Sequence, residues 1–256
     1  MNGNSVKPAM VLAYHEVMPE SNYAYCVTCE DFAGHMALVR SLHKNGAFAA
    51  TVTFDDGEES QYRNAVPLLA EQGIKATFFV NPGLVGTEAK FLGWEKLQEL
   101  QAAGHSIQSH GCSHKFLPAC SDKELGYELG GSRELLEDKL GTPVEEISVP
   151  GGRWDQRVLA ACARAGYKRV YVSEPWLNAD VCGLEVAGRF MVRRTTTLPE
   201  LQKMIERDKR ALWAMKMRSQ LRRGVVSVVG DDLYHRLWCR LTGYDEFEAA
   251  RQDQSS

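Results

Sequence analysis

The chain repeats one pattern: an amphipathic helical segment, a glycine directly after it, and then a short β-branched or aromatic run. The glycines are Gly46, Gly73, Gly104, Gly141 and Gly166, and the runs that follow lie at 47–54, 74–80, 105–109, 144–149 and 167–172. A glycine at this place is typical of the left-handed residue that ends a helix. Helices that alternate with strands in this way predict parallel βα units. With residues 10–14 as an opening strand, at least six strands are expected, and we predict a (β/α) barrel, with an open doubly wound sheet as the alternative.

Length and composition suit one large α/β domain or two small ones. The chain has 256 residues, of which 44% are hydrophobic and 25% are charged, as in ordinary soluble globular proteins. The formal net charge of −3 gives no electrostatic footprint for nucleic acid, so we expect no nucleic-acid partner. No uninterrupted apolar run reaches the length of a transmembrane helix.

The cysteines and the first residues bear on the compartment. The seven cysteines form an odd, scattered set, which is typical of free thiols in a reducing compartment. Residues 1–8 lack the apolar core of a signal peptide. We therefore expect a cytoplasmic protein, and a peripheral position at the inner membrane face is kept as an alternative.

Polar side chains stand where the expected strands end. In parallel βα folds, functional groups gather at the C-terminal ends of the strands. There stand His15 after the first strand, Asp55 and Asp56 after the second, Asn81 after the third, His110 after the fourth, Pro150 to Gly152 after the fifth, and Ser173 with Glu174 after the sixth. Two aspartates and two histidines on one face are typical of a metal site or of acid–base chemistry. Because successive side chains of a strand point to opposite sides, Asp55 and Asp56 are expected to do different jobs. Taken alone, Asp-Asp-Gly could equally be an acidic turn.

A second histidine, His114, lies four residues after His110. On a helical turn, residues four apart lie about 5–6 Å from one another on one face. Two imidazoles so placed can share a zinc-like ion with a carboxylate as the third ligand, which leaves a position open for water. Cys112, between the two histidines, is expected to be structural rather than a ligand.

At this point the sequence resembles the polysaccharide deacetylase family (the NodB-homology domain). Thr53–Gly57 is similar to its first motif and Ser109–His114 to its second, a His-x-x-x-His segment, and the likeness covers roughly residues 10 to 195. The resemblance implies a distorted (β/α)7 barrel that removes N-acetyl groups from amino sugars with a divalent metal ion, that is, a hydrolase of carbon–nitrogen bonds other than peptide bonds. It also implies that Asp56, His110 and His114 bind the metal and that Asp55 is the catalytic base. Zinc is the expected ion, with cobalt, nickel, iron or manganese as alternatives.

The third motif of the family is altered here. The family places an arginine two residues before a proline and an aromatic residue after it, whereas this chain has Ser148 before Pro150 and Gly151 after it. The sequence therefore leaves the partner that orients the base unassigned. Pro150, Gly151 and the nearby Trp154 are expected to bind substrate, with a backbone N–H near Pro150 holding the oxyanion.

The general acid is assigned to the first strand. His15 follows Tyr14 and resembles the Tyr-His segment that supplies the acid in permuted members of the family. The alternative is a buried, hydrogen-bonded histidine without a chemical role.

After the barrel the pattern changes. We expect a barrel domain at 1–197, a basic amphipathic helical extension at 198–247 and a disordered tail at 248–256. One helix is expected to carry Leu201, Met204, Ile205, Leu212 and Met215 on one face and basic residues on the other. Residues 200–223 are candidates for contact with an anionic membrane surface, and a solvated helix packed on the barrel is the alternative.

These features predict a metal-dependent deacetylase of an N-acetylated saccharide or glycan intermediate. Two rivals remain: a non-catalytic carbohydrate-binding or scaffold protein that kept the fold, and a hydrolase of a different amide. The sequence leaves the oligomeric state open.

Overall fold

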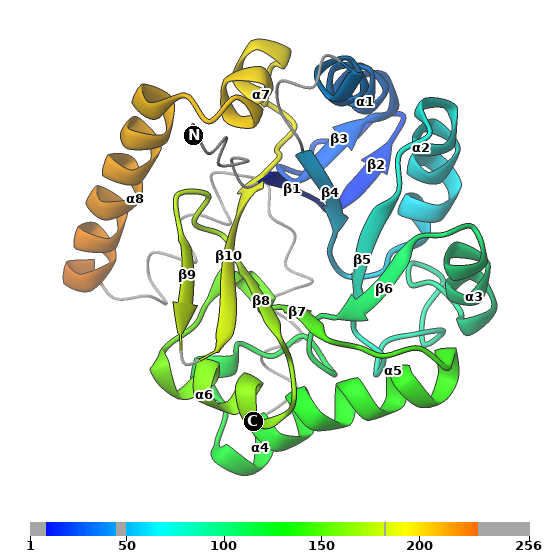
Figure 1. Ribbon diagram of the computed structural model, residues 1–256, viewed down its shortest axis with the longest axis vertical. Coiled ribbons are helices and arrows are strands. Elements are labelled where there is room, and N and C mark those ends of the chain that lie inside the picture. The colour runs from blue at the N-terminus through cyan, green and yellow to red at the C-terminus, as the bar shows by residue number, and fades with distance from the viewer. Residues whose placement is uncertain (1–8, 45–49, 182, 230–256) are drawn as a thin grey trace, which may run out of the picture.

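A computed structural model describes residues 9–44, 50–181 and 183–229, with side chains as far as residue 221. Within these residues, seven parallel strands close into a barrel (Figure 1). In barrel order they are β1 (Met10–Tyr14), β4 (Ala50–Phe54), β5 (Ala76–Val80), β6 (Ser106–Ser109), β7 (Glu146–Ser148), β8 (Arg169–Val172) and β10 (Leu184–Met191). The last of these pairs with the first, with Leu12 opposite Phe190. The predicted barrel is confirmed, and the open-sheet alternative is wrong because this pairing leaves the parallel sheet no edge.

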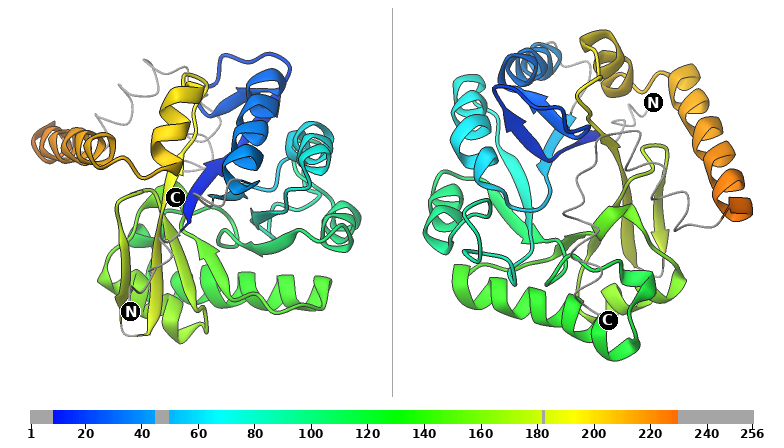
Figure 2. Two further views of the ribbon diagram at one scale, coloured as in Figure 1. Left: turned by 45° about the horizontal axis from the view of Figure 1, so that its top comes forward. Right: turned by 180° about the vertical axis from the view of Figure 1, so that it is seen from behind.

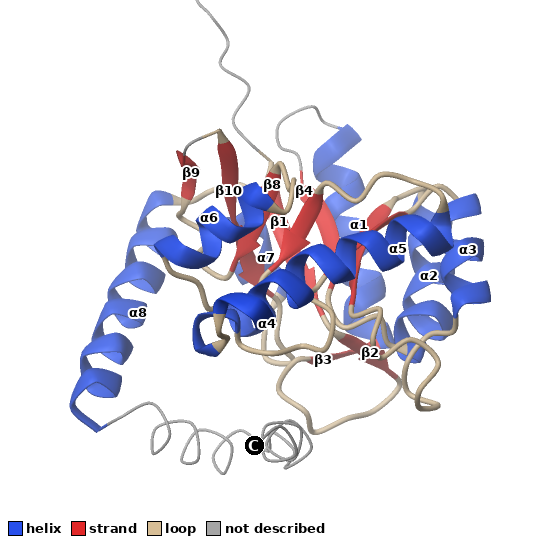
Figure 3. Cartoon of the chain, turned by 90° about the horizontal axis from the view of Figure 1, so that it is seen from below, coloured by secondary structure: helices blue, strands red, loops and turns tan. Residues whose placement is uncertain are grey.

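Helices cover the outside of the barrel (Figure 3). They are α1 (Cys29–Lys44), α2 (Val66–Gln72), α3 (Trp94–Ala102), α4 (Asp122–Gly126), α5 (Ser132–Leu140), α6 (Gln156–Arg164), α7 (Leu198–Ile205) and α8 (Lys209–Val229). Two π-helical turns, η1 (Gln61–Ala65) and η3 (Tyr127–Gly131), lead directly into α2 and α5, and η2 (Leu117–Ala119) and η4 (Pro150–Gly152) are 3-10 turns. Four of the five predicted helix-ending glycines have the expected positive φ, at Gly73, Gly104, Gly141 and Gly166. The fifth, Gly46, lies outside the described residues.

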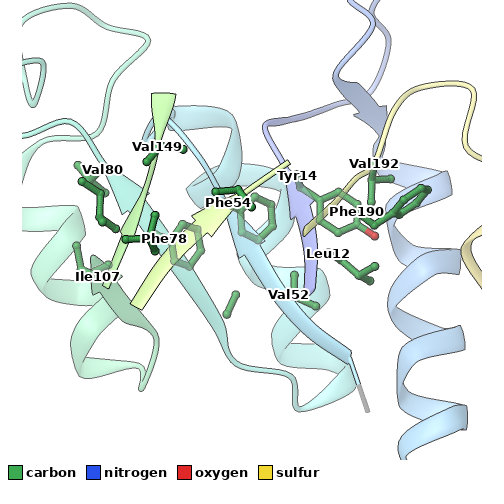
Figure 4. Packing of buried hydrophobic residues seen from close by; sticks show 14 of the residues in the cluster. Leu12, Tyr14, Val52, Phe54, Phe78, Val80, Ile107, Val149, Phe190 and Val192 are labelled. Carbon is green, nitrogen blue, oxygen red and sulfur yellow. The ribbon is translucent and has the colours of Figure 1, made fainter. Parts of the chain in front are cut away.

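Alternation along the strands separates two environments. Leu12, Tyr14, Val52, Phe54 and Phe78 belong to the buried cluster that packs between barrel and helices (Figure 4). The rings of Phe54 and Phe78, on neighbouring strands, stack with centroids 4.9 Å apart. The alternate positions face the barrel interior, where a second, small cluster consists of Phe79, Tyr171 and Ala187 with Val11 against it. Thr53 and Asp55 occupy alternate positions that face the barrel interior. The carboxylate of Asp55, directly after β4, therefore points into the barrel.

Four strands escaped the sequence analysis. The strand β10 closes the barrel, and β9 (Asn178–Val181) pairs with it in antiparallel register. A two-stranded parallel sheet, β2 (Glu16–Met18) with β3 (Cys26–Thr28), lies beyond the end of β1. The short length of β2 and β3 gives too few residues for a periodic signal.

Within the described residues of the predicted extension, 198–229, two helices stand where one amphipathic helix was expected, so the single helix is wrong there. The break falls at Arg207, whose φ of 56° ends α7. Leu201, Met204 and Ile205 are buried on the α7 side facing α1, whereas α8 runs along the edge of the molecule (Figure 2). Among the described residues, no helix is long and apolar enough to cross a membrane. The expected tail at 248–256 lies outside the described residues.

A buried histidine at the opposite end of the barrel predicts a pH effect on stability. His105 Nδ1 accepts a hydrogen bond from the Ala76 amide at 3.1 Å, and burial lowers the pKa of this imidazole from its ordinary value of 6.5. Protonation therefore favours the unfolded chain, so the stability that His105 contributes is present above its unfolded pKa and is lost as the pH falls from 6.5 through the folded pKa. We expect His105→Asn, which keeps an acceptor, to reduce the loss of stability between about pH 7 and about pH 5, measured by urea unfolding. The same substitution at the exposed His43 should leave the pH dependence unchanged.

Candidate active site

Three predicted metal ligands meet at the C-terminal end of the barrel. Asp56 follows β4, and His110 and His114 follow β6. Asp56 Oδ1 lies 3.6 Å from His110 Nε2 and 3.3 Å from His114 Nε2. One ligand atom from each of the three residues lies within 4.8 Å of the other two. This spacing lets one ion contact all three.

The two histidines approach through a loop, not through the helical turn that their spacing suggested. Residues 111–116 form no helix, Gly111 has φ 75° and His114 has φ 64°. The imidazole centroids are nevertheless 5.1 Å apart. Asp56 also has a positive φ, of 74°. A left-handed conformation at a non-glycine residue costs free energy and persists where the surroundings enforce it, so the loop is held in its shape by its neighbours.

The protonation of His110 suits a metal ligand. Its Nδ1 lies 2.7 Å from the Ser148 carbonyl, to which only an N–H can donate, so Nε2 carries the lone pair that faces Asp56. Burial lowers the pKa of His110 to about 4, which keeps the ring neutral.

Asp56 supplies the negative charge. Burial raises the pKa of Asp56, but His114 and His110 outweigh that effect and hold the pKa below its usual range. Its Oδ1 is buried and has no hydrogen-bond partner. An orphaned carboxylate oxygen facing two imidazole nitrogens fits a divalent cation, because such a cation would supply the missing contact.

The neighbouring carboxylate has a different environment, because Asp55 turns into the barrel and pairs with Arg189. The two side chains are almost fully buried, and they form two hydrogen bonds: Arg189 Nη1 to Asp55 Oδ1 at 2.7 Å and Nη2 to Oδ2 at 2.6 Å. Burial raises the pKa of Asp55, but Arg189 and His110 outweigh it and hold the pKa far below its usual range. Asp55 is therefore an ionised, oriented carboxylate, 3.9 Å from His110 Nε2.

Arg189 is a residue of the candidate site that the sequence analysis missed. It stands on β10, whereas the family motif led us to look for an arginine near Pro150. Ser148, at the motif position, instead bridges the ion pair: its hydroxyl accepts from Arg189 Nη2 at 2.6 Å and donates to Asp55 Oδ2 at 3.2 Å. A usable signal was an arginine within an apolar run, Gly188–Val192, at the inward parity of a strand.

His15 lies at the same end of the barrel, directly after β1. Gln61, buried in η1, donates to the His15 carbonyl at 2.9 Å and also to the Asp55 carbonyl, which ties the two strand ends together. The His15 ring packs on Tyr25 with centroids 5.0 Å apart, and its Nδ1 is buried without a hydrogen-bond partner. His15 is close enough to both aspartates to lower the pKa of each, as a lesser contribution.

The predicted substrate-binding residues lie in the segment after β7, the strand whose Ser148 contacts His110 and Asp55. Pro150 is buried at the start of η4, and Gly151 follows with φ 62° at a point where a side chain would collide with Phe116. Trp154 is half-buried, packs against the core and donates from Nε1 to Glu174 at 3.4 Å. Glu174 thus fixes the indole at the rim of the barrel.

Fold and site together define a parallel βα-barrel protein with a candidate metal centre at its strand ends. A family model described as polysaccharide deacetylase matches residues 43–170, half of the chain. The chain belongs to the polysaccharide deacetylase family.

Individual relatives agree with this. The chain is 29% identical over 208 residues to YxkH of Bacillus subtilis, whose name assigns it to the polysaccharide deacetylases, and the match covers 73% of this chain and 72% of that protein. It is 31% identical over 139 residues to a chitooligosaccharide deacetylase of Sinorhizobium fredii, covering 53% of this chain but only 62% of that relative. The fold resembles the Streptococcus pyogenes deacetylase PplD, solved in complex with acetate, with a TM-score of 0.68 over 77% of this chain and 97% of that one at 22% identity.

Proposed function

We propose that this protein is a metal-dependent hydrolase that removes N-acetyl groups from an N-acetylated saccharide. The observation that carries the proposal is the pairing of two adjacent aspartates with different partners: Asp56 with two imidazoles, and Asp55 with a buried guanidinium. Family membership supports the reaction class. Zinc is the proposed ion, because one carboxylate and two imidazoles are ligands that zinc accepts.

The proposed chemistry divides among the residues at the barrel mouth. Arg189 keeps the Asp55 carboxylate ionised and oriented before the reaction, and Asp55 then takes a proton from the attacking water. A divalent ion, when bound by Asp56, His110 and His114, polarises the amide carbonyl and lowers the pKa of water. His15 gives a proton to the departing amine, which leaves poorly as an anion. The backbone N–H of Gly151 is proposed to help hold the oxyanion, and Pro150 and Trp154 to contact the sugar.

One rival reading loses its main support. The idea of a non-catalytic carbohydrate-binding protein drew on the altered third motif, in which Ser148 stands where the family has an arginine. Arg189 reaches the Asp55 carboxylate from β10 and can take the place of the arginine that the motif lacks. Hydrolysis of a different amide by the same groups remains as the second candidate.

Acetate release tests the proposal. Purified protein, stripped with a chelator, would be assayed with N-acetylglucosamine oligomers and lipid-linked N-acetylated sugars, and then again after addition of zinc, cobalt, nickel, manganese or iron. We expect acetate only from metal-loaded protein. Acetate at the same rate from stripped protein would disprove metal dependence, whereas glycan binding without acetate on any substrate would favour the binding protein.

The proposed role of His15 gives a prediction of its own. We expect His15→Ala to lower kcat on an N-acetylated sugar by about a hundredfold, because proton donation to the leaving amine is lost. The loss should be smaller on 4-nitroacetanilide, whose amine leaves more readily. Replacing the exposed His43 by alanine is the matched control. An equal loss on both substrates would contradict the acid role.

We also propose that residues 200–223 contact an anionic membrane surface, with α8 as the contacting element. Trp213, Met217 and Leu221 recur every fourth residue on the outer side of α8 and are 65%, 44% and 73% exposed. The exposed cations Lys209, Arg210, Lys216 and Arg218 flank this row, and residues 209–229 contain no acidic residue. Apolar side chains bordered by cations suit the interface of an anionic bilayer. We propose a cytoplasmic location, because the described cysteines are unpaired thiols.

Vesicle sedimentation tests this contact. We expect the protein to sediment with vesicles containing phosphatidylglycerol and to remain in solution with phosphatidylcholine alone. Replacing Trp213, Met217 and Leu221 together by serine should weaken binding at least about tenfold. Serine at the exposed Tyr127, which lies outside α8, is the control. Unchanged binding of the triple variant, or a dimer that only the triple variant disrupts, would argue against a membrane contact.

A further inference from the structure

A second buried carboxylate, Glu128, lies behind the loop that presents His114. The side chain is 1% exposed and stands on η3, the π-helical turn within the helical run 122–140. Its Oε2 accepts hydrogen bonds from the backbone amides of Cys112 and Ser113 at 2.8 and 2.9 Å. Its Oε1 accepts from the Ser113 hydroxyl. One carboxylate thus receives three donors from two consecutive loop residues.

The position of Glu128 follows from the π turn. A π turn inserts one extra residue into a helix and is frequent at functional sites, because it redirects side chains locally. Glu128 has α4 before it and α5 after it, and Ser132 at the start of α5 reaches the same loop, since its hydroxyl donates to the Gly111 carbonyl at 3.2 Å. The helical run 122–140 therefore contacts the loop in two ways: Glu128 accepts hydrogen bonds from loop amides, and Ser132 donates one to a loop carbonyl.

The loop depends on these contacts. His114 has a left-handed φ of 64°, and Gly111 one of 75°. The carbonyl oxygens of the loop have other partners. The Asn81 side-chain amide donates to the His110 and Gly111 carbonyls, and the Gly83 backbone amide donates to the Cys112 carbonyl at 2.9 Å. Among the described contacts, the Cys112 and Ser113 amides go to Glu128 alone. Without Glu128 these two amides would lose their hydrogen bonds, and the amide of the buried Cys112 would be left unsatisfied.

We propose that Glu128 is a positioning residue for the metal centre: it fixes the loop 111–114 so that His114 faces Asp56 and His110. This inference rests on the metal site of the proposed function. Residues that orient metal ligands typically change metal affinity about 10- to 100-fold when they are removed. This role depends on hydrogen-bond acceptor atoms and not on negative charge. A glutamine at position 128 could therefore replace Glu128, because its oxygen can accept from both amides and its nitrogen can donate to the Ser113 hydroxyl.

Zinc affinity, measured by competition with a chromophoric chelator, tests the inference. We expect Glu128→Ala to weaken binding about 10- to 100-fold and Glu128→Gln to stay within about threefold of the wild type. Leu129→Ala, at the next position in the same π turn and equally buried, is the control: it should lower the melting temperature but leave the affinity of the folded protein unchanged. An affinity of Glu128→Ala within threefold of the wild type, or an equal loss in Leu129→Ala, would overturn the assignment.

Amide hydrogen exchange in the metal-free protein separates this inference from the proposed function. We expect the Cys112 and Ser113 amides to be protected in the wild type and in Glu128→Gln and to exchange much faster in Glu128→Ala. If the alanine variant fails to fold, Glu128→Asp, which is one methylene shorter, should show the same faster exchange. A wild type that binds no metal would end the proposed function, while unchanged exchange at these two amides would end the role of Glu128.

Discussion

Replacing Asp55 by asparagine is expected to lower kcat for acetate release by about a thousandfold, within the range of a lost general base. The side chain keeps its shape but can no longer accept the proton of the attacking water. Zinc affinity should change little, because Asp56, His110 and His114 are untouched. The measurement is kcat together with metal content for both proteins.

The control for this change is Asp138→Asn, a substitution of the same kind at an aspartate whose side chain is 73% exposed. It should leave kcat unaltered. A variant at Asp55 that kept more than about a tenth of the wild-type kcat would refute its role as base.

Replacing Arg189 by methionine is expected to reduce the free energy of unfolding by about 3–5 kcal/mol, because the Asp55 carboxylate would remain buried without its counter-ion. The pKa of Asp55 should rise, since burial would be opposed by fewer charges. Activity would then fall and move toward higher pH. Urea unfolding and a pH–rate profile measure the two effects.

A double variant sharpens this prediction. Asp55→Asn together with Arg189→Met removes both charges, so most of the stability lost in Arg189→Met should return. Arg133→Met is the control, because Arg133 and Glu137 form a partly exposed ion pair, with side chains 27% and 33% exposed, and its loss should cost no more than about 1 kcal/mol. A double variant less stable than Arg189→Met would contradict the idea of a buried unpaired charge.

Local patterns in the sequence predicted most of the barrel. The helix–glycine–strand units correspond to the β4, β5, β6, β7 and β8 strands with their preceding helices. The alternation of side chains along the strand predicted different roles for Asp55 and Asp56, and the strand-end positions predicted that His15, Asp56 and His110 lie at one end of the barrel. These features depend on neighbours in the chain, so they can be read without a structure.

What the sequence did not show depends on contacts between distant residues. Asp55 and Arg189 are 134 positions apart, and only the closure of the barrel brings them together. The approach of His110 to His114 depends on a positive φ that Glu128 helps to enforce from another element, so the spacing predicted the pair but not its loop geometry. The break at Arg207 replaced one expected helix by two, because a single left-handed residue is enough to turn the chain.

The position of Arg189 on the closing strand has a consequence for the order of events during synthesis. The N-terminal residues emerge from the ribosome first, so Asp55 exists for more than a hundred residues of elongation before its partner is made. A nascent chain that stops before β10 holds a carboxylate with no guanidinium to receive it, and burial of that charge opposes compaction. The strand that completes the barrel wall also supplies the guanidinium that pairs with Asp55, so a chain truncated before β10 lacks both the closed barrel and the partner of the proposed base.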